Sequence, residues 1–135
     1  MITNDNAKTY NISANISPID IELCKVYIRG AVNAICNYSE IAEFSVRILF
    51  GGNNRDWYKT PLQKIYDYHH FIDGKDCETA AKSSAKDVGM LLKTVLEEDS
   101  RNFEIVRIDT GKVYKLAKQK KQARKLRHRF VVRCL

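Results

Sequence analysis

The spacing of apolar and polar residues predicts a long first helix. Ser17-Pro18-Ile19-Asp20 has the composition of a helix N-terminus: a serine N-cap, a proline at the first helical position and an acid three residues after the cap. From there to about Tyr38 most positions are apolar. The polar positions recur three or four residues apart, as Glu22, Lys25, Arg29, Asn33 and Asn37. A helix that is apolar around most of its circumference is buried centrally or lies against a partner. A strand through the sequence KVYIRG is an alternative to this part of the helix.

The next segments are shorter. Between Phe44 and Phe50 apolar residues alternate with other residues, which fits either a short strand or a single helical turn that ends at Gly51. The residues Gly51-Gly52-Asn53-Asn54 have the composition of a loop. Thr60-Pro61 then predicts an N-cap and a helix that ends near Asp73-Gly74, with His69 on its apolar face.

The clearest helical pattern runs from Glu78 to Asp99, with apolar residues at helical spacing throughout, although a break near residues 87–89 would divide it into two helices. Residues 103–116 alternate as in a β-hairpin whose turn is Asp109-Thr110-Gly111. The sequence FVVRC near the end is a possible last strand. The polar residues 1–16 are either a disordered arm or an edge strand.

These elements predict an α+β fold that is mainly helical, with three to four helices and one β-hairpin. A chain of 135 residues has the length of one domain. We therefore expect a polar arm over residues 1–16, a core over residues 17–117 and a basic C-terminal segment over residues 118–135.

The order of three helices followed by a hairpin with a basic tip resembles a winged helix-turn-helix domain over about residues 18–117. The hairpin would be the wing, with Arg107, Lys112 and Lys115 on or near it. The resemblance implies a DNA-binding fold, in which the exposed face of residues 78–86, with Lys82, Ser83 and Lys86, approaches a groove of the nucleic acid.

The segment ETAAKSSAKDVGMLLKTVL carries this resemblance at the level of residues. Ala81 and Ala85 are small where two helices of the motif pack closely. The segment departs from the pattern at Ser84 and Lys86, where an apolar residue is usual, and at Gly89, which comes late for the turn.

Charge is distributed unevenly along the chain. The formal net charge is +7, and the ten basic residues after Asp109 leave residues 1–109 with 7 minus 10, or −3. The twelve residues KQKKQARKLRHR contain seven bases and no acid. These bases are Lys118, Lys120, Lys121, Arg124, Lys125, Arg127 and Arg129. Such a segment is typical of phosphate contacts, which release counterions and depend steeply on salt.

These observations predict a non-catalytic protein that binds nucleic acid, DNA before RNA because of the resemblance alone. Three alternatives stay open for the basic segment: an acidic protein surface, the acidic body of a second copy, or a solvated tail. A different class of function, a protein-binding adaptor or inhibitor, is indicated by the broad apolar surface of the first predicted helix, which would serve a partner or a homodimer.

No enzyme motif of comparable strength is present. Asp109-Thr110-Gly111 has the letters of an aspartic protease triplet, but a turn followed by Lys112 lacks the apolar surroundings and second copy that this chemistry needs. A small nuclease would need Asp56, Asp67, Asp73 and Asp76 to converge, which their spacing does not indicate.

Metal and membrane signals are also weak. His69 and Asp73 are one helical turn apart without an identifiable third ligand, and the four cysteines have no metal-binding spacing, so we predict neither a metal nor a cofactor. The chain has no long apolar run and does not begin with a secretory signal, which predicts a cytoplasmic protein with no membrane contact.

Overall fold

The computed structural model describes residues 1–5, 11–38, 42–51, 56–108 and 111–117 of the chain. The helices are α1 (Pro18–Tyr38), α2 (Val46–Phe50), α3 (Gln63–Asp67), the π-helix η1 (Tyr68–Ile72) and α4 (Cys77–Glu98). The strands are β1 (Glu43–Phe44), β2 (Phe103–Ile108) and β3 (Lys112–Leu116). The predicted α+β class, mainly helical with a hairpin, is confirmed.

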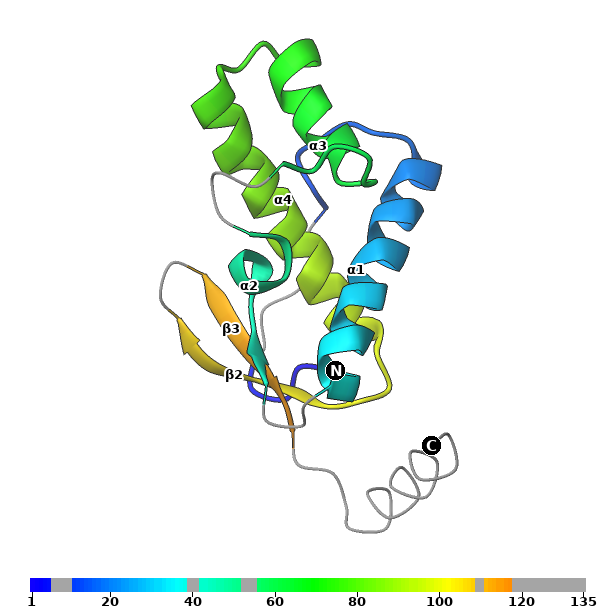
Figure 1. Ribbon diagram of the computed structural model, residues 1–135, viewed down its shortest axis with the longest axis vertical. Coiled ribbons are helices and arrows are strands. Elements are labelled where there is room, and N and C mark those ends of the chain that lie inside the picture. The colour runs from blue at the N-terminus through cyan, green and yellow to red at the C-terminus, as the bar shows by residue number, and fades with distance from the viewer. Residues whose placement is uncertain (6–10, 39–41, 52–55, 109–110, 118–135) are drawn as a thin grey trace.

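Helix α4 crosses the middle of the molecule (Figure 1). Helix α1 lies along one side of it, whereas α2 and the hairpin lie on another side, and α3 packs near its N-terminal end. The core fills the space between α1, α4 and the sheet, with fully buried Ile28 and Val32 from α1 and Leu92 and Leu96 from α4. No helix of the described residues is long and apolar enough to cross a membrane.

The sheet is antiparallel, and its strand order is β1-β3-β2. Its inner side is aromatic: the ring centroid of Phe44 lies 5.9 Å from that of Phe103 and 6.0 Å from that of Tyr114. The chain start joins this sheet, because Ile2 forms a parallel bridge with Phe103, and Phe103 N–H donates to the Met1 carbonyl over 2.7 Å. Segments at opposite ends of the described chain are therefore packed together. Asp109 and Thr110 of the predicted turn lie outside the described residues.

The two long helices follow the sequence prediction closely. The hydroxyl of Ser17 accepts the N–H of Asp20 over 3.1 Å, as the predicted N-cap requires. Helix α4 is continuous from Cys77 to Glu98, so the break considered near residue 88 does not occur. Its N-terminus is capped by Asp76, whose carboxylate accepts the N–H of Thr79 over 2.7 Å.

The predictions for two shorter segments differ from the structure in part. Of the residues considered for a strand between 44 and 50, only Phe44 belongs to one, as the second residue of β1. The helical alternative is correct: Ser45 caps α2 by accepting the N–H of Ile48. The predicted N-cap at Thr60 is wrong. Its hydroxyl donates to the Trp57 carbonyl over 2.7 Å, and α3 begins at Gln63 without a side-chain cap.

The helix predicted to reach Asp73 changes its winding after Asp67. In η1 the N–H of Asp73 donates to the carbonyl of Tyr68, five residues back, over 2.8 Å. The next bond runs from the N–H of Lys75 to the carbonyl of His69. This winding directs His69 into the protein, where 1% of its surface is exposed.

Candidate nucleic-acid interface

An open groove of about 1190 Å³ lies between α4, α2 and the β2–β3 hairpin. Helix α4 supplies one wall through the small residues Ala81, Ala85 and Gly89, which follow one another at a spacing of four. Trp57 lines the groove and is held in place because its indole N–H donates to the Phe50 carbonyl over 3.2 Å. The opposite wall is formed by the hairpin. The groove is thus a junction of segments that are distant in sequence.

Basic side chains surround this groove. They are Arg47 from α2, Lys82, Lys86 and Lys93 from α4, and Arg107 and Lys112 from the hairpin. Among the described lining residues, Asp56 is the one carboxylate. Lys82, Lys86 and Lys93 are four and seven residues apart, so they form one stripe about 16 Å long at 1.5 Å per residue.

Some of these cations are held by acids beside the groove. Arg107 pairs with Glu43, and the Lys112 ammonium lies 2.8 Å from the carboxylate of Asp5. Lys93 also reaches Asp5, at 3.5 Å. These pairs connect the hairpin and α4 to β1 and to the chain start, so they fix the positions of three positive charges.

The remaining cations are directed toward solvent. Lys82 meets Glu78 at 3.5 Å in an exposed i,i+4 pair, which contributes little energy in water. In the part of the chain that the structure describes, neither Arg47 nor Lys86 lies within 4.0 Å of an acid, and both are exposed. Even with Asp5, Glu43 and Glu78 counted beside Asp56, six positive charges face four negative ones. The groove therefore favours an anion.

The structure brings together only part of the predicted site. Lys82, Lys86, Arg107 and Lys112 meet around the groove, whereas Lys115 does not line it and pairs in register with Glu43 and Glu104. The bases of the segment KQKKQARKLRHR lie outside the described residues.

Ser83, the third residue predicted on this part of α4, is directed toward Lys75. Ser83 is absent from the groove lining, and its hydroxyl accepts a hydrogen bond from the Lys75 ammonium over 3.0 Å.

Two lining cations were not predicted. Lys93 is seven residues after Lys86, and this helical spacing was a usable signal. Arg47 belongs to the segment whose helix or strand conformation the sequence left open, so its direction was not predictable.

Tyr114 belongs to the core and not to an open surface. Its side chain is 3% exposed, and burial raises the pKa of its hydroxyl to about 12. The hydrogen bond with Cys77 raises the pKa of Tyr66, which lines the groove near the start of α4.

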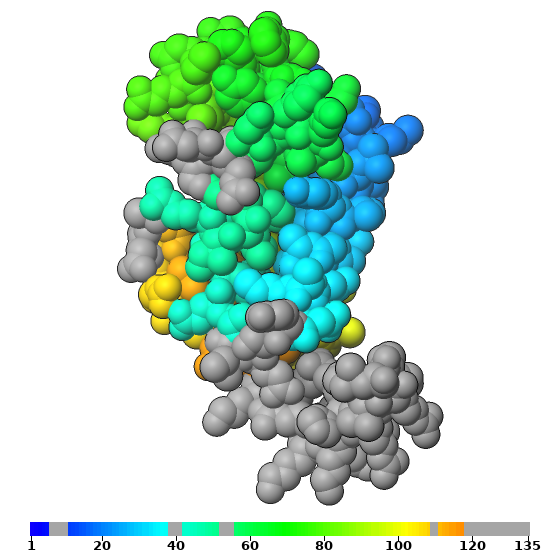
Figure 2. All heavy atoms as spheres, viewed as in Figure 1, coloured from blue at the N-terminus to red at the C-terminus, as the bar shows by residue number. Residues whose placement is uncertain are grey.

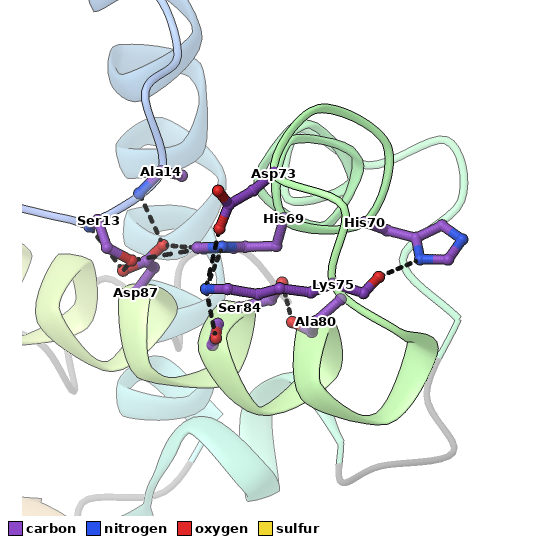
Figure 3. A network of polar contacts seen from close by, with 10 residues as sticks. Ser13, Ala14, His69, His70, Asp73, Lys75, Ala80, Ser84 and Asp87 are labelled. Carbon is purple, nitrogen blue, oxygen red and sulfur yellow. Dashed lines mark hydrogen bonds and ion pairs between the residues drawn. The ribbon is translucent and has the colours of Figure 1, made fainter.

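A buried polar network surrounds Asp87, near the middle of α4 (Figure 3). The Asp87 carboxylate, 1% exposed, accepts the N–H of Ser13 at 2.9 Å, the Ser13 hydroxyl at 2.8 Å and the N–H of Ala14 at 3.1 Å. His69 Nε2 lies 2.7 Å from the same carboxylate. A buried carboxylate requires such donors, because removal from water without them is costly. The network fastens residues 13 and 14 onto α4.

The hydrogen bonds of His69 determine its tautomer. The Lys75 ammonium lies 3.2 Å from His69 Nδ1, and an ammonium can only donate. His69 Nδ1 is therefore the acceptor, and the proton is on Nε2, directed at Asp87. His69 is thus a buried, hydrogen-bonded histidine, and both of its ring nitrogens are engaged.

Ser13, His69 and Asp87 do not have the geometry of a catalytic triad. In a triad the histidine contacts serine and aspartate through opposite nitrogens. Here the Ser13 hydroxyl lies 3.5 Å from Nε2, the same nitrogen that contacts Asp87. The network therefore has a structural role, which is to hold Ser13 and Ala14 against α4.

Three of the carboxylates considered for a nuclease are engaged in local contacts. Asp67 accepts from Gln63, Asp73 pairs with Lys75, and Asp76 caps α4. Among the described residues, no three histidines, cysteines or acids are grouped so that they could hold a metal ion.

Comparison with family models, curated proteins and solved structures finds no match to this chain. Its function must therefore be inferred from the groove and its charges.

Proposed function

We propose that this protein binds nucleic acid without catalysis and that the groove between α4 and the hairpin is its contact surface. The observation that carries the proposal is the meeting of six basic side chains from three elements around one open groove. Positive charges aligned along a groove attract a phosphate backbone and release its counterions.

The two groups of cations have different roles. Arg107 and Lys112, held by Glu43 and Asp5, orient the hairpin relative to α4. Arg47, Lys82 and Lys86 are directed to solvent and contact phosphates. The basic segment 118–129 adds phosphate contacts without sequence preference. DNA is preferred over RNA, a choice that rests on the winged-helix resemblance of the sequence.

Fluorescence anisotropy with labelled duplex and single-stranded oligonucleotides, over a salt titration, tests this proposal. The informative variant is Arg47→Gln with Lys86→Gln, and the matched control is Lys59→Gln with Lys64→Gln. The control removes two exposed charges that do not line the groove. On duplex DNA, we expect the groove variant to reduce the slope of log affinity against log salt by about 2, roughly 0.9 for each lost phosphate contact.

The control variant should change this slope much less. A third variant, truncated after Ala117, measures the contribution of the basic segment. If the groove and control variants behave alike while the truncation abolishes binding, the groove is not the contact surface. If neither the full chain nor any variant binds at low salt, the proposal as a whole is wrong.

A further inference from the structure

Trp57 contributes a fixed aromatic ring to the lining of the groove. The polar atom of the ring is already engaged, because the indole N–H donates to the Phe50 carbonyl over 3.2 Å. The side chain packs against the hydrophobic core but is only partly buried, and the rest of it lines the groove. Trp57 therefore offers a ligand apolar contact and π-surface, with no free hydrogen-bond donor.

The groove leaves space beside this ring. On the α4 wall, Ala81 and Ala85 carry one methyl group each and Gly89 carries none. A Cβ atom on Gly89 would lie 3.9 Å from Val46 Cγ2, so α2 and α4 come together at this point and close the groove with apolar groups. The volume of about 1190 Å³ exceeds the roughly 300–1,000 Å³ of pockets that hold drug-sized molecules. The groove thus has room for more than one nucleotide.

Charged and apolar side chains occupy different levels of the groove. Arg47, Lys82 and Lys86 are exposed, whereas Val46 and Met90 are partly buried. Figure 2 shows α2 (teal) at the surface between the hairpin (yellow to orange) and α1 (blue to cyan). The cations therefore form a rim above an apolar and aromatic interior. A single strand of nucleic acid has the matching division, with charged phosphates along its backbone and unpaired bases that stack on aromatic rings.

A fully paired duplex matches only the rim. Its bases are stacked on one another, so the face of a base reaches Trp57 only after it leaves the stack, which costs free energy. We therefore expect a duplex to contact the exposed cations alone. A strand with unpaired bases can contact the cations and the indole ring together.

We propose that the groove binds a single-stranded segment of nucleic acid, with an unpaired base stacked on Trp57 and the neighbouring phosphates held by Arg47, Lys82 and Lys86. This inference rests on the proposed function and adds to it a contact that only unpaired bases make. Stacking of one base on an aromatic side chain should raise the affinity for a single strand about 5- to 100-fold.

The chain contains one tryptophan, so its intrinsic tryptophan fluorescence reports on Trp57 alone. The full chain is titrated with an unlabelled single-stranded oligonucleotide, with a duplex of the same sequence, and with a single strand of the same length built of abasic sites. A base stacked on the indole quenches its emission by direct contact. We expect strong quenching by the base-containing strand and little quenching by the duplex or the abasic strand.

The abasic strand is also the matched control for affinity, because it keeps the phosphates of a single strand and lacks the bases. The base-containing strand should bind about 5- to 100-fold more tightly than the abasic one. Equal affinities of these two strands, or equal quenching by the single strand and the duplex, would overturn the proposal.

Two variants test the role of the aromatic face. Trp57→Leu removes it and should weaken single-strand binding, measured by fluorescence anisotropy, about 5- to 100-fold, with much less effect on the duplex. Trp57→Phe also lacks the indole N–H but keeps an aromatic face, so it should retain most of the single-strand affinity. Equal losses in the two variants, with folding intact by circular dichroism, would contradict stacking. Trp57 packs against the core, so the quenching of the unaltered chain decides the question if either variant fails to fold.

The outcomes separate this inference from the proposed function. If every oligonucleotide binds and Trp57 emission does not change, the phosphate contacts remain and stacking is wrong. If no oligonucleotide binds even at low salt, the proposed function is wrong and the inference falls with it.

Discussion

The two halves of α4 have opposite surroundings. The second half, from Val88 onward, is held by apolar contacts: Val88, Val95 and Leu96 are fully buried and Leu92 nearly so. The first half has Lys82 and Lys86 in solvent on one side and the Asp87 network on the other. Stability thus comes mainly from one half of the helix, and the candidate contact surface comes mainly from the other. This separation allows surface charges to change without loss of the fold.

The largest effect is expected in the apolar half. Leu92→Ala removes a side chain that is 1% exposed at the contact of α4 with the core. The lost burial and the cavity left behind should lower the free energy of unfolding by about 3–4 kcal/mol. Urea unfolding followed by circular dichroism measures this loss. The matched variant Lys86→Gln should change stability by less than about 0.5 kcal/mol. Similar losses in both variants would remove the distinction between the two halves.

A smaller effect is expected at the boundary between the halves. Asp87→Asn keeps the size of the side chain but exchanges one acceptor oxygen for a donor that faces the N–H groups of residues 13 and 14 or His69. Loss of these buried hydrogen bonds should lower the free energy of unfolding, measured by the same urea titration, by about 2–3 kcal/mol.

The N-terminal segment should also become accessible in Asp87→Asn. Amide hydrogen exchange at Ser13 and Ala14 should accelerate more than exchange in α1, because the carboxylate holds these two N–H groups directly. Unchanged exchange at both residues would show that the network does not fasten this segment.

Local signals made the long helices predictable. Ser17 at the N-cap of α1 and the apolar spacing of α4 act within a few residues, so they are visible in the sequence. Five residues such as 46–50 fit both helical and strand periodicity, and only the capping bond of Ser45 decides between them. The η1 winding was not predictable, since it places His69 against Asp87 and close to Ser13, which is 56 residues away in the sequence.

The groove was predictable in part. Lys82 and Lys86 share a face of α4 by their spacing, and Arg107 and Lys112 were expected because the hairpin resembles a wing. The addition of Arg47 and the exclusion of Lys115 depend on how α2 and β1 pack against other elements, which local patterns do not contain.

The smallest expected effect is a gain in stability at Gly89, where the two halves of α4 meet. Gly89 is within a helix and does not have a positive φ, so its backbone accepts any ordinary residue. A Cβ atom there would lie 3.9 Å from Val46 Cγ2, an ordinary van der Waals contact. Gly89→Ala should therefore raise the free energy of unfolding by about 0.5–1 kcal/mol through helix propensity.

The same variant sharpens the comparison, because Gly89 also lines the groove. If only side-chain cations contact the nucleic acid, Gly89→Ala should be more stable and bind duplex DNA with unchanged affinity and salt slope. A large loss of affinity with the gain in stability intact would mean that the ligand approaches the backbone of α4 within the space of one methyl group. Phosphates would then lie between the two halves of the helix and not only along Lys82 and Lys86. A loss of stability would instead show that Val46 cannot accommodate the methyl group and that α2 is packed rigidly against α4.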